Sequence, residues 1–202
     1  MLVVFLFALL CLMTVSHSAP LACEDLVRPL DQFDPNDLEG RWSLVAGSTT
    51  LPTTLEDLKD RGSMTVYFSN SSETSVYTFT QVNRLGDNCY HLFHNFTIKN
   101  STFTHKLDSF VNLTASFLYT SCQDCMLLRF VFEGRSMTMV DFYLFSRRRE
   151  LEQREMEDFR AQMECVKMPA PDVMDPTKEL CPKETISAPA AQTEEKTEEK
   201  EA

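Results

Sequence analysis

The sequence predicts an all-β fold, an eight-stranded up-and-down antiparallel β-barrel with one C-terminal α-helix packed on the barrel. Three observations support this prediction. Short runs rich in Val, Thr, Phe and Tyr follow one another between residues 42 and 146. Turn-forming clusters separate the runs, so that the strands lie about 8 to 12 residues apart, a spacing typical of β-sandwiches and barrels. One segment of helical periodicity then precedes an acidic end.

The chain begins with an apolar run, residues 2–15, followed by the small and polar stretch Ser16-His17-Ser18-Ala19. The run is shorter than the roughly 20 apolar residues of a membrane-spanning helix, and it is typical of a secretory signal peptide. We therefore expect a signal peptide over residues 1–18 and a secreted, extracellular protein. Because no Lys or Arg precedes the run, a leader that stays attached is the alternative.

Sequons and cysteines also fit export. The N-x-S/T sequons predict glycosylation at Asn70, Asn95, Asn100 and Asn112. Apart from Cys11 in the leader, the chain has six cysteines, an even number that predicts three disulfides in an oxidising compartment. Spacing alone leaves their pairing open.

Cys122 and Cys125 have the spacing of a redox or zinc motif. A redox C-x-x-C lies at a helix N-terminus in a βαβ unit, and a zinc site needs a second Cys or His pair nearby. The sequence offers neither, so a local structural disulfide is the favoured interpretation. We predict no metal site.

Eight runs carry the strand pattern: residues 42–49, 63–69, 74–82, 88–98, 102–107, 110–119, 126–133 and 136–146. Side chains alternate across a strand, and a glycosylated Asn must face solvent. An outward Asn112 therefore directs Leu113, Ala115 and Phe117 inward, and the small Ala115 leaves space for a ligand. A barrel of eight strands has room for its own side chains or for one small ligand.

Residues 148–166 have helical spacing, with Phe159 and Met163 on one apolar face. This face is expected to pack on the outside of the barrel. Pro169 and Pro171 are expected to end the regular structure.

The C-terminal residues 184–202 are acidic and contain Ile186 as their one large apolar residue, which predicts a disordered tail. Residues 19–183 are then expected to form a single domain. The net charge of −11 argues against a nucleic-acid partner, which requires a basic surface.

The sequence gives no support for catalysis. It contains no G-x-S-x-G, H-E-x-x-H or phosphate-loop motif. His91 and His94 are close in sequence, but three residues apart on a strand they face opposite sides and do not jointly bind a metal. We predict a non-enzymatic protein with neither catalytic residues nor a cofactor.

The motif Gly40-Arg41-Trp42 before the strands, and Phe145-Ser146-Arg147 before the helix, resemble the lipocalin family. Segments 19–23, 87–90 and 159–181 are similar to orosomucoid, apolipoprotein M and the pufferfish proteins that bind saxitoxin and tetrodotoxin, all of that family. The resemblance covers nearly the whole chain after the leader.

This resemblance implies that Trp42 closes the narrow end of the barrel and that Arg147 stacks on it in a cation–π contact. The disulfides that it implies are Cys23–Cys165 and Cys89–Cys181. Cys122 and Cys125 depart from the orosomucoid pattern.

We therefore expect a secreted glycoprotein, a monomer that carries a small hydrophobic or amphiphilic ligand in its lumen, such as a lipid, steroid, drug-like molecule or toxin. Candidate ligand contacts are Phe68, Tyr77, Phe79, Val111, Leu113, Phe117, Phe130, Tyr143 and Phe145. Some of them are expected to be plain core residues. The alternatives are a lipoprotein-associated protein anchored by its retained leader and an acute-phase immunomodulatory glycoprotein that acts on a cell-surface receptor.

Overall fold

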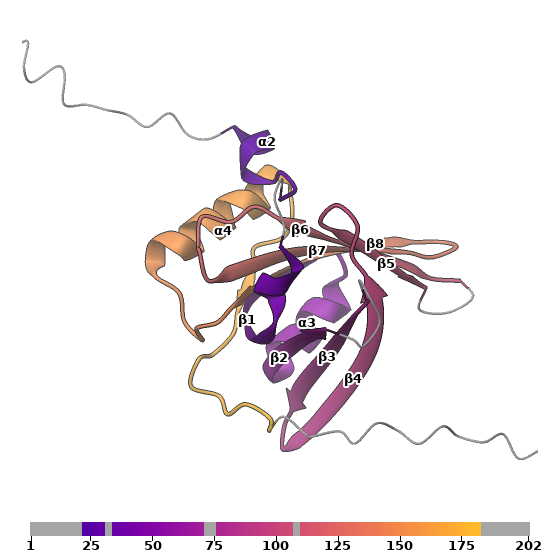
Figure 1. The fold of residues 1–202 in the computed structure, drawn as a ribbon. Coiled ribbons are helices and arrows are strands. Elements are labelled where there is room, and N and C mark those ends of the chain that lie inside the picture. Colours follow the sequence, from indigo (N-terminus) through magenta and orange to yellow (C-terminus); the bar gives the residue numbers. More distant parts are fainter. Residues whose placement is uncertain (1–21, 31–33, 71–75, 107–109, 183–202) are drawn as a thin grey trace, which may run out of the picture.

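The computed structural model describes residues 22–30, 34–70, 76–106 and 110–182. The predicted leader and acidic tail fall outside these residues. In the described part, no helix has the length and apolar character needed to span a membrane. The chain folds into one antiparallel sheet that curves into a nearly closed barrel (Figure 1).

The eight strands of the barrel are β1 (Gly40–Thr49), β2 (Arg61–Asn70), β3 (Val76–Leu85), β4 (Asn88–Thr97), β5 (Thr102–Lys106), β6 (Asn112–Leu118), β7 (Cys125–Glu133) and β8 (Thr138–Ser146). They confirm the predicted fold class, and each lies within a few residues of a predicted strand. Their order in the sheet is β4-β3-β2-β1-β8-β7-β6-β5.

The two outer strands of this order, β4 and β5, form the seam of the barrel. In the turn that joins them, Lys99 forms an isolated bridge with Thr102, the first residue of β5. Within the described residues, no ladder of hydrogen bonds continues this contact along the two strands. Side chains therefore have to hold the seam together.

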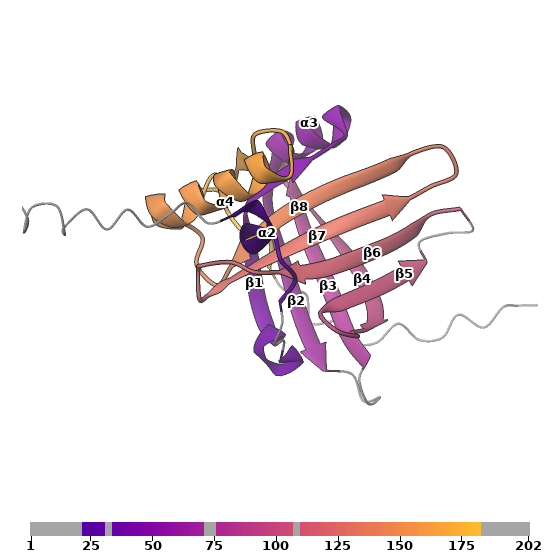
Figure 2. The ribbon, with the colours of Figure 1, turned by 90° about the horizontal axis from the view of Figure 1, so that it is seen from above.

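β1 connects the two halves of the barrel. Its residues 40–43 pair with β2 and its residues 43–49 pair with β8, with a register shift between Leu44 and Ala46. A bulge of this kind bends a strand and increases its twist. Figure 2 shows that β1–β4 and β5–β8 consequently lie at an angle to one another.

One helix, α4 (Gln153–Cys165), lies on the outer face of the barrel, as predicted (Figure 2). It buries Met156 and Met163 against outward side chains of β1, β6, β7 and β8. The helix begins later than predicted because Glu152 and Glu155 form a capping box, in which each carboxylate accepts a hydrogen bond from the other residue's backbone N–H.

Four short elements have no counterpart in the sequence prediction. They are α2 (Cys23–Leu26), the 3-10 helix η1 (Pro35–Leu38), α3 (Pro52–Asp60) and β9 (Asp172–Val173). β9 pairs with β1 beyond Pro169 and Pro171, so the expectation that these prolines end the regular structure is wrong. A strand of two residues is too short to show a periodic pattern.

Three disulfides are present: Cys23–Cys165, Cys89–Cys181 and Cys122–Cys125. The first joins α2 to α4, and the second joins the start of β4 to the segment after β9. These two are the pairs that the lipocalin resemblance implies. The third closes the turn between β6 and β7.

At the narrow end of the barrel, the buried Trp42 donates from Nε1 to the backbone oxygen of Leu38 at 2.8 Å. The guanidinium of Arg147 lies over the indole, with its central carbon 3.7 Å from the ring centroid. It also donates to the backbone oxygens of Asp37, Glu39 and Arg41. One side chain thus joins the end of β8 to η1 and to the start of β1.

Gly40 makes this stacking possible. Its φ of +101° lies in a region that favours glycine. A Cβ atom at this position would lie 3.0 Å from Nη1 of Arg147. A side chain there would therefore crowd the guanidinium, which explains why a glycine precedes Trp42 at this spacing.

We predict that Trp42→Ala lowers the free energy of unfolding by about 3 to 5 kcal/mol, as truncation of a buried aromatic side chain does. Arg147→Lys keeps the charge but loses the planar guanidinium that stacks on the indole and donates to several backbone oxygens. We expect this substitution to lower the free energy of unfolding by about 1 to 2 kcal/mol. Urea unfolding followed by circular dichroism measures both, because Trp42 is the only tryptophan and fluorescence would lose its probe. An Arg147→Lys midpoint equal to that of the wild type would contradict the role of the arginine.

Candidate ligand-binding site

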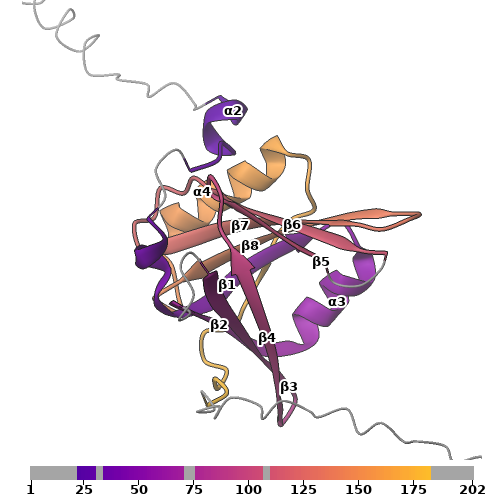
Figure 3. The ribbon, with the colours of Figure 1, turned by 45° about the vertical axis from the view of Figure 1, so that its right-hand side comes forward.

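The barrel contains a cavity of about 300 Å³ towards the end opposite Trp42. Small-molecule sites span about 300 to 1,000 Å³, so the cavity suits a small ligand. Strands β2 to β8 and α3 supply its wall: Thr54, Arg61, Met64, Phe79, Gln81, Leu92, His94, Phe96, Phe103, His105, Leu113, Phe130, Phe132, Met139, Asp141 and Tyr143. Figure 3 shows α3 at this end, between the β3–β4 and β7–β8 hairpins.

Aromatic rings form much of this wall. Phe96 of β4 and Phe103 of β5 stack across the seam with ring centroids 4.2 Å apart. Phe130 lies 5.7 Å from Tyr143, and Phe79 lies 6.5 Å from Phe96. Aromatic pairs at such distances stabilise each other beyond the area that they bury. The rings therefore supply contacts at the seam, where the backbone ladder is missing.

Asp141 is a deeply buried carboxyl group in this wall, with 2 % of its surface exposed. The hydroxyl of Tyr143 donates to its Oδ2 at 3.0 Å, whereas its Oδ1 has no hydrogen-bond partner among the described residues. Burial raises the pKa of the Asp141 carboxyl, although the hydroxyls of Thr49 and Tyr143 oppose the rise. Burial and the neighbouring Asp141 raise the pKa of the Tyr143 phenol, which therefore stays a neutral donor.

His94 of β4 and His105 of β5 also line the cavity and face each other across the seam, with ring centroids 5.0 Å apart. Burial, and then the neighbouring His105, lowers the pKa of His94. Its imidazole is therefore neutral at pH 7. His91 is close to His94 in the chain, but the neighbour of His94 in space is His105, which the sequence did not predict.

The predicted ligand contacts fall into separate groups in the structure. Those that line the cavity are Phe79, Leu113, Phe130 and Tyr143. Those that are buried in the packed core without lining the cavity are Phe68, Phe117 and Phe145. Tyr77 packs beside Phe96 at the edge of the core, and Val111 lies outside the strands. Phe68, Phe117, Phe145, Tyr77 and Val111 thus do not line this cavity.

The alternating pattern identifies the inward face of a strand but not the depth of a residue along the barrel. Ala115 illustrates this limit, because it faces inward as predicted but is fully buried and does not line the cavity. The cavity wall also contains the polar residues Arg61, Gln81 and Asp141, which the strand pattern did not predict as ligand contacts. For Asp141 a signal exists, since it is an acid on the otherwise apolar inward face of the last strand.

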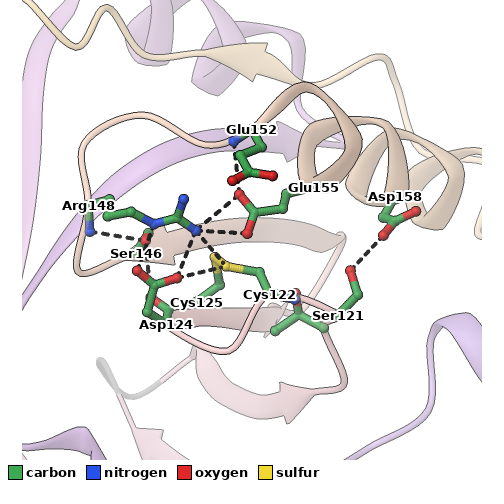
Figure 4. Close-up of polar contacts among 10 residues, drawn as sticks. Ser121, Cys122, Asp124, Cys125, Ser146, Arg148, Glu152, Glu155 and Asp158 are labelled. Atoms are coloured by element: carbon green, nitrogen blue, oxygen red, sulfur yellow. Dashed lines mark hydrogen bonds and ion pairs between the residues drawn. A yellow bond between two sulfur atoms is a disulfide. The ribbon is translucent and has the colours of Figure 1, made fainter.

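A second polar cluster lies at the closed end of the barrel (Figure 4). Cys122 and Cys125 are bonded to each other, so neither is a thiolate that a metal could bind with the nearby Asp124. Arg148 binds the Asp124 carboxylate through Nε and Nη2 at 2.7 and 2.8 Å, and Nη2 also reaches Glu155 of α4 at 2.8 Å. These contacts lower the pKa values of both carboxyls. The cluster attaches α4 to the β6–β7 turn and is structural.

Comparison with solved structures shows which fold this is. The structure is similar to that of the siderocalin Ex-FABP, which functions through dual ligand specificities, with a TM-score of 0.62 and 15 % identity over 74 % of this chain and 97 % of that one. It is also similar to lipocalin 12 from rat epididymis, with a TM-score of 0.65 and 15 % identity over 76 % and 91 % of the two chains. The chain therefore has the lipocalin fold. Neither a protein-family model nor a curated protein matches its sequence.

The histidines at the seam predict a pH dependence of stability. Because the pKa of His94 is lower in the folded state than in the unfolded chain, its contribution is present above about pH 6.5 and is lost as the pH falls below that value. We expect the thermal midpoint to fall by a few degrees between pH 7.5 and pH 5.5, and to fall less in His105→Gln. Asp141 shifts stability in the opposite direction, but it is present in both proteins. Equal losses in the two proteins would contradict coupling across the seam.

Proposed function

We propose that this chain is a secreted lipocalin that carries one small hydrophobic or amphiphilic molecule in the cavity. The observation that carries the proposal is the space of about 300 Å³ inside the barrel, lined largely by aromatic and aliphatic side chains with a few polar groups. Proteins of this fold are typically carriers of such ligands. The same function is what the sequence motifs predict if their resemblance to orosomucoid, apolipoprotein M and the toxin-binding proteins of pufferfish reflects kinship.

Binding in this cavity would work by burial. A ligand that moves its apolar surface from water to the aromatic wall gains about 25 cal/mol per Å². The few polar groups of the wall then set its orientation. The narrow end of the barrel, next to Trp42, is filled by Phe68, Phe117 and Phe145. The ligand would therefore enter from the opposite end, on the side of α3.

We predict that the protein takes up N-phenyl-1-naphthylamine, an apolar dye that fluoresces in apolar surroundings. Met139→Trp should weaken this binding at least tenfold, about 1.4 kcal/mol, because it places a large ring in the cavity wall. Thr138→Trp is the matched control, since Thr138 is exposed and does not line the cavity. Failure of the folded wild-type protein to bind the dye would refute the carrier function, and equal loss in both variants would place the dye elsewhere.

Export is supported by the leader and by six cysteines joined in disulfides. Asn95, Asn100 and Asn112 are exposed, as glycosylation requires, whereas the side chain of Asn70 lies outside the described residues.

We predict that the chain secreted by eukaryotic cells begins at Ala19 and carries N-linked glycans. Intact mass measured before and after enzymatic deglycosylation, with N-terminal sequencing, tests both points. Asn→Gln at an occupied sequon should remove the mass of one glycan. A secreted chain that begins at Met1 would favour the alternative of a lipoprotein-associated protein with a retained anchor.

A further inference from the structure

His94 and His105 form a pair of metal-ligating side chains that the proposed carrier function does not use. His94 belongs to β4 and His105 to β5, and their imidazole centroids lie 5.0 Å apart across the seam. Neither imidazole has a hydrogen-bond partner among the described residues. Both side chains are only partly buried, so a dissolved ion can reach them. Their ring nitrogens are therefore available to a ligand from outside the chain.

The geometry of the pair matches two imidazoles that share one metal ion. A zinc–nitrogen bond of about 2.0 to 2.1 Å and a tetrahedral angle between ligands place two imidazole centroids about 5 Å apart. The observed separation of 5.0 Å agrees with this value. The ring planes are inclined at 58°, so the rings are not stacked face to face and their edges can converge on one point.

The sheet holds both histidines in place. His94 pairs with Phe79 in the ladder between β3 and β4, and His105 pairs with Leu113 in the ladder between β5 and β6. Two residues from each histidine, Phe96 and Phe103 stack across the same seam with centroids 4.2 Å apart. A metal site built on strands is more precise than one built on loops. The chain therefore brings the two imidazoles together before any ion binds.

The donor atoms determine which ions suit the pair. Imidazole nitrogen suits zinc, copper and nickel, whereas magnesium and calcium prefer oxygen ligands. Among the described residues, no carboxylate or cysteine lies close enough to the two histidines to form a group of three ligands with them. Two nitrogens from the protein and water at the remaining positions therefore define the coordination.

We propose that His94 and His105 bind a divalent transition-metal ion, Zn²⁺ or Cu²⁺, which connects β4 to β5 across the seam. The ion would supply a link at the one junction of neighbouring barrel strands where the described residues form no backbone ladder. The two histidines come from different strands, which explains why the sequence shows no metal-binding motif. This site does not depend on the carrier function, because it needs no ligand in the lumen.

The test titrates the full secreted chain, freed of metal with EDTA and dialysed, with Zn²⁺ at pH 7.5 in a calorimeter. We expect one Zn²⁺ per chain. His94→Gln and His105→Gln should each weaken binding by about tenfold or more, because each removes one of only two protein ligands. Undiminished binding in both variants would overturn the inference, and so would Mg²⁺ binding as tight as that of Zn²⁺.

His91→Gln is the matched control. His91, His94 and His105 are the histidines that follow the predicted leader, and His91 lies on the opposite face of β4 from His94. Its replacement should leave Zn²⁺ binding unchanged. A loss equal to that in His94→Gln would place the ion elsewhere and overturn the inference.

Hydrogen exchange of backbone amides, followed by mass spectrometry, locates the ion. Zn²⁺ should slow exchange in residues 88–97 and 102–106 of the wild-type protein but not of His105→Gln. Protection confined to other segments, such as the turn that contains Asp124, would overturn the inference. If a glutamine variant does not fold, exchange in the wild-type protein decides. A protein that takes up the dye but binds no Zn²⁺ refutes only the metal site, and one that binds Zn²⁺ but no dye refutes only the carrier function.

Discussion

The closure of the barrel at its narrow end by Trp42 and Arg147 is the contact on which the rest of the structure depends. The guanidinium of Arg147 stacks on the indole and also binds three backbone oxygens between residues 37 and 41. It therefore fixes the end of β8 against the start of β1, the pair of strands that joins the two halves of the sheet. With this end closed, Phe68, Phe117 and Phe145 pack into the core above Trp42, and the aromatic-lined cavity of the lumen lies towards the other end.

The seam between β4 and β5, unlike the closed end, is held by side chains alone in the described residues. Every other neighbouring pair of barrel strands shares a ladder, whereas the described residues of the seam are held by Phe96 stacked on Phe103 and by His94 beside His105. Elements with few backbone hydrogen bonds open at a lower cost than the core of a sheet. All four side chains line the cavity. The weakest side of the barrel is thus also a wall of the site, so ligand binding and the stability of the seam are expected to be coupled.

The strands could be predicted because their side chains alternate between apolar and polar residues, and because a sequon asparagine indicates which face is turned to solvent. Asn112 marks the outer face of β6, and Leu113 and Phe117 accordingly face inward. Depth along the barrel could not be predicted in the same way. Leu113 and Phe117 both face inward on β6, but only Leu113 lines the cavity. Depth depends on the stagger of the strands and on the bulge in β1, and neither produces a periodic signal in the sequence.

Contacts between distant segments were predictable only through the family resemblance. Spacing alone left the cysteine pairing open, and the resemblance supplied Cys23–Cys165 and Cys89–Cys181. No comparable guide existed for His105, which meets His94 only because the turn after β4 returns the chain along the seam. α3 was missed for a different reason, since a short amphipathic helix between two strands has too few turns to show its period.

A cavity with a buried carboxylate lowers the stability of a barrel, and the raised pKa of Asp141 reflects that cost. The two long-range disulfides act in the opposite direction. They span sequence separations of 142 and 92 residues, for which loss of entropy in the unfolded chain gives about 5 kcal/mol each. Both attach segments outside the barrel to its wall, and neither fills the lumen. The chain therefore obtains this stability from constraints outside the site, which leaves the inside of the barrel free to keep an unfilled space and a buried carboxyl group.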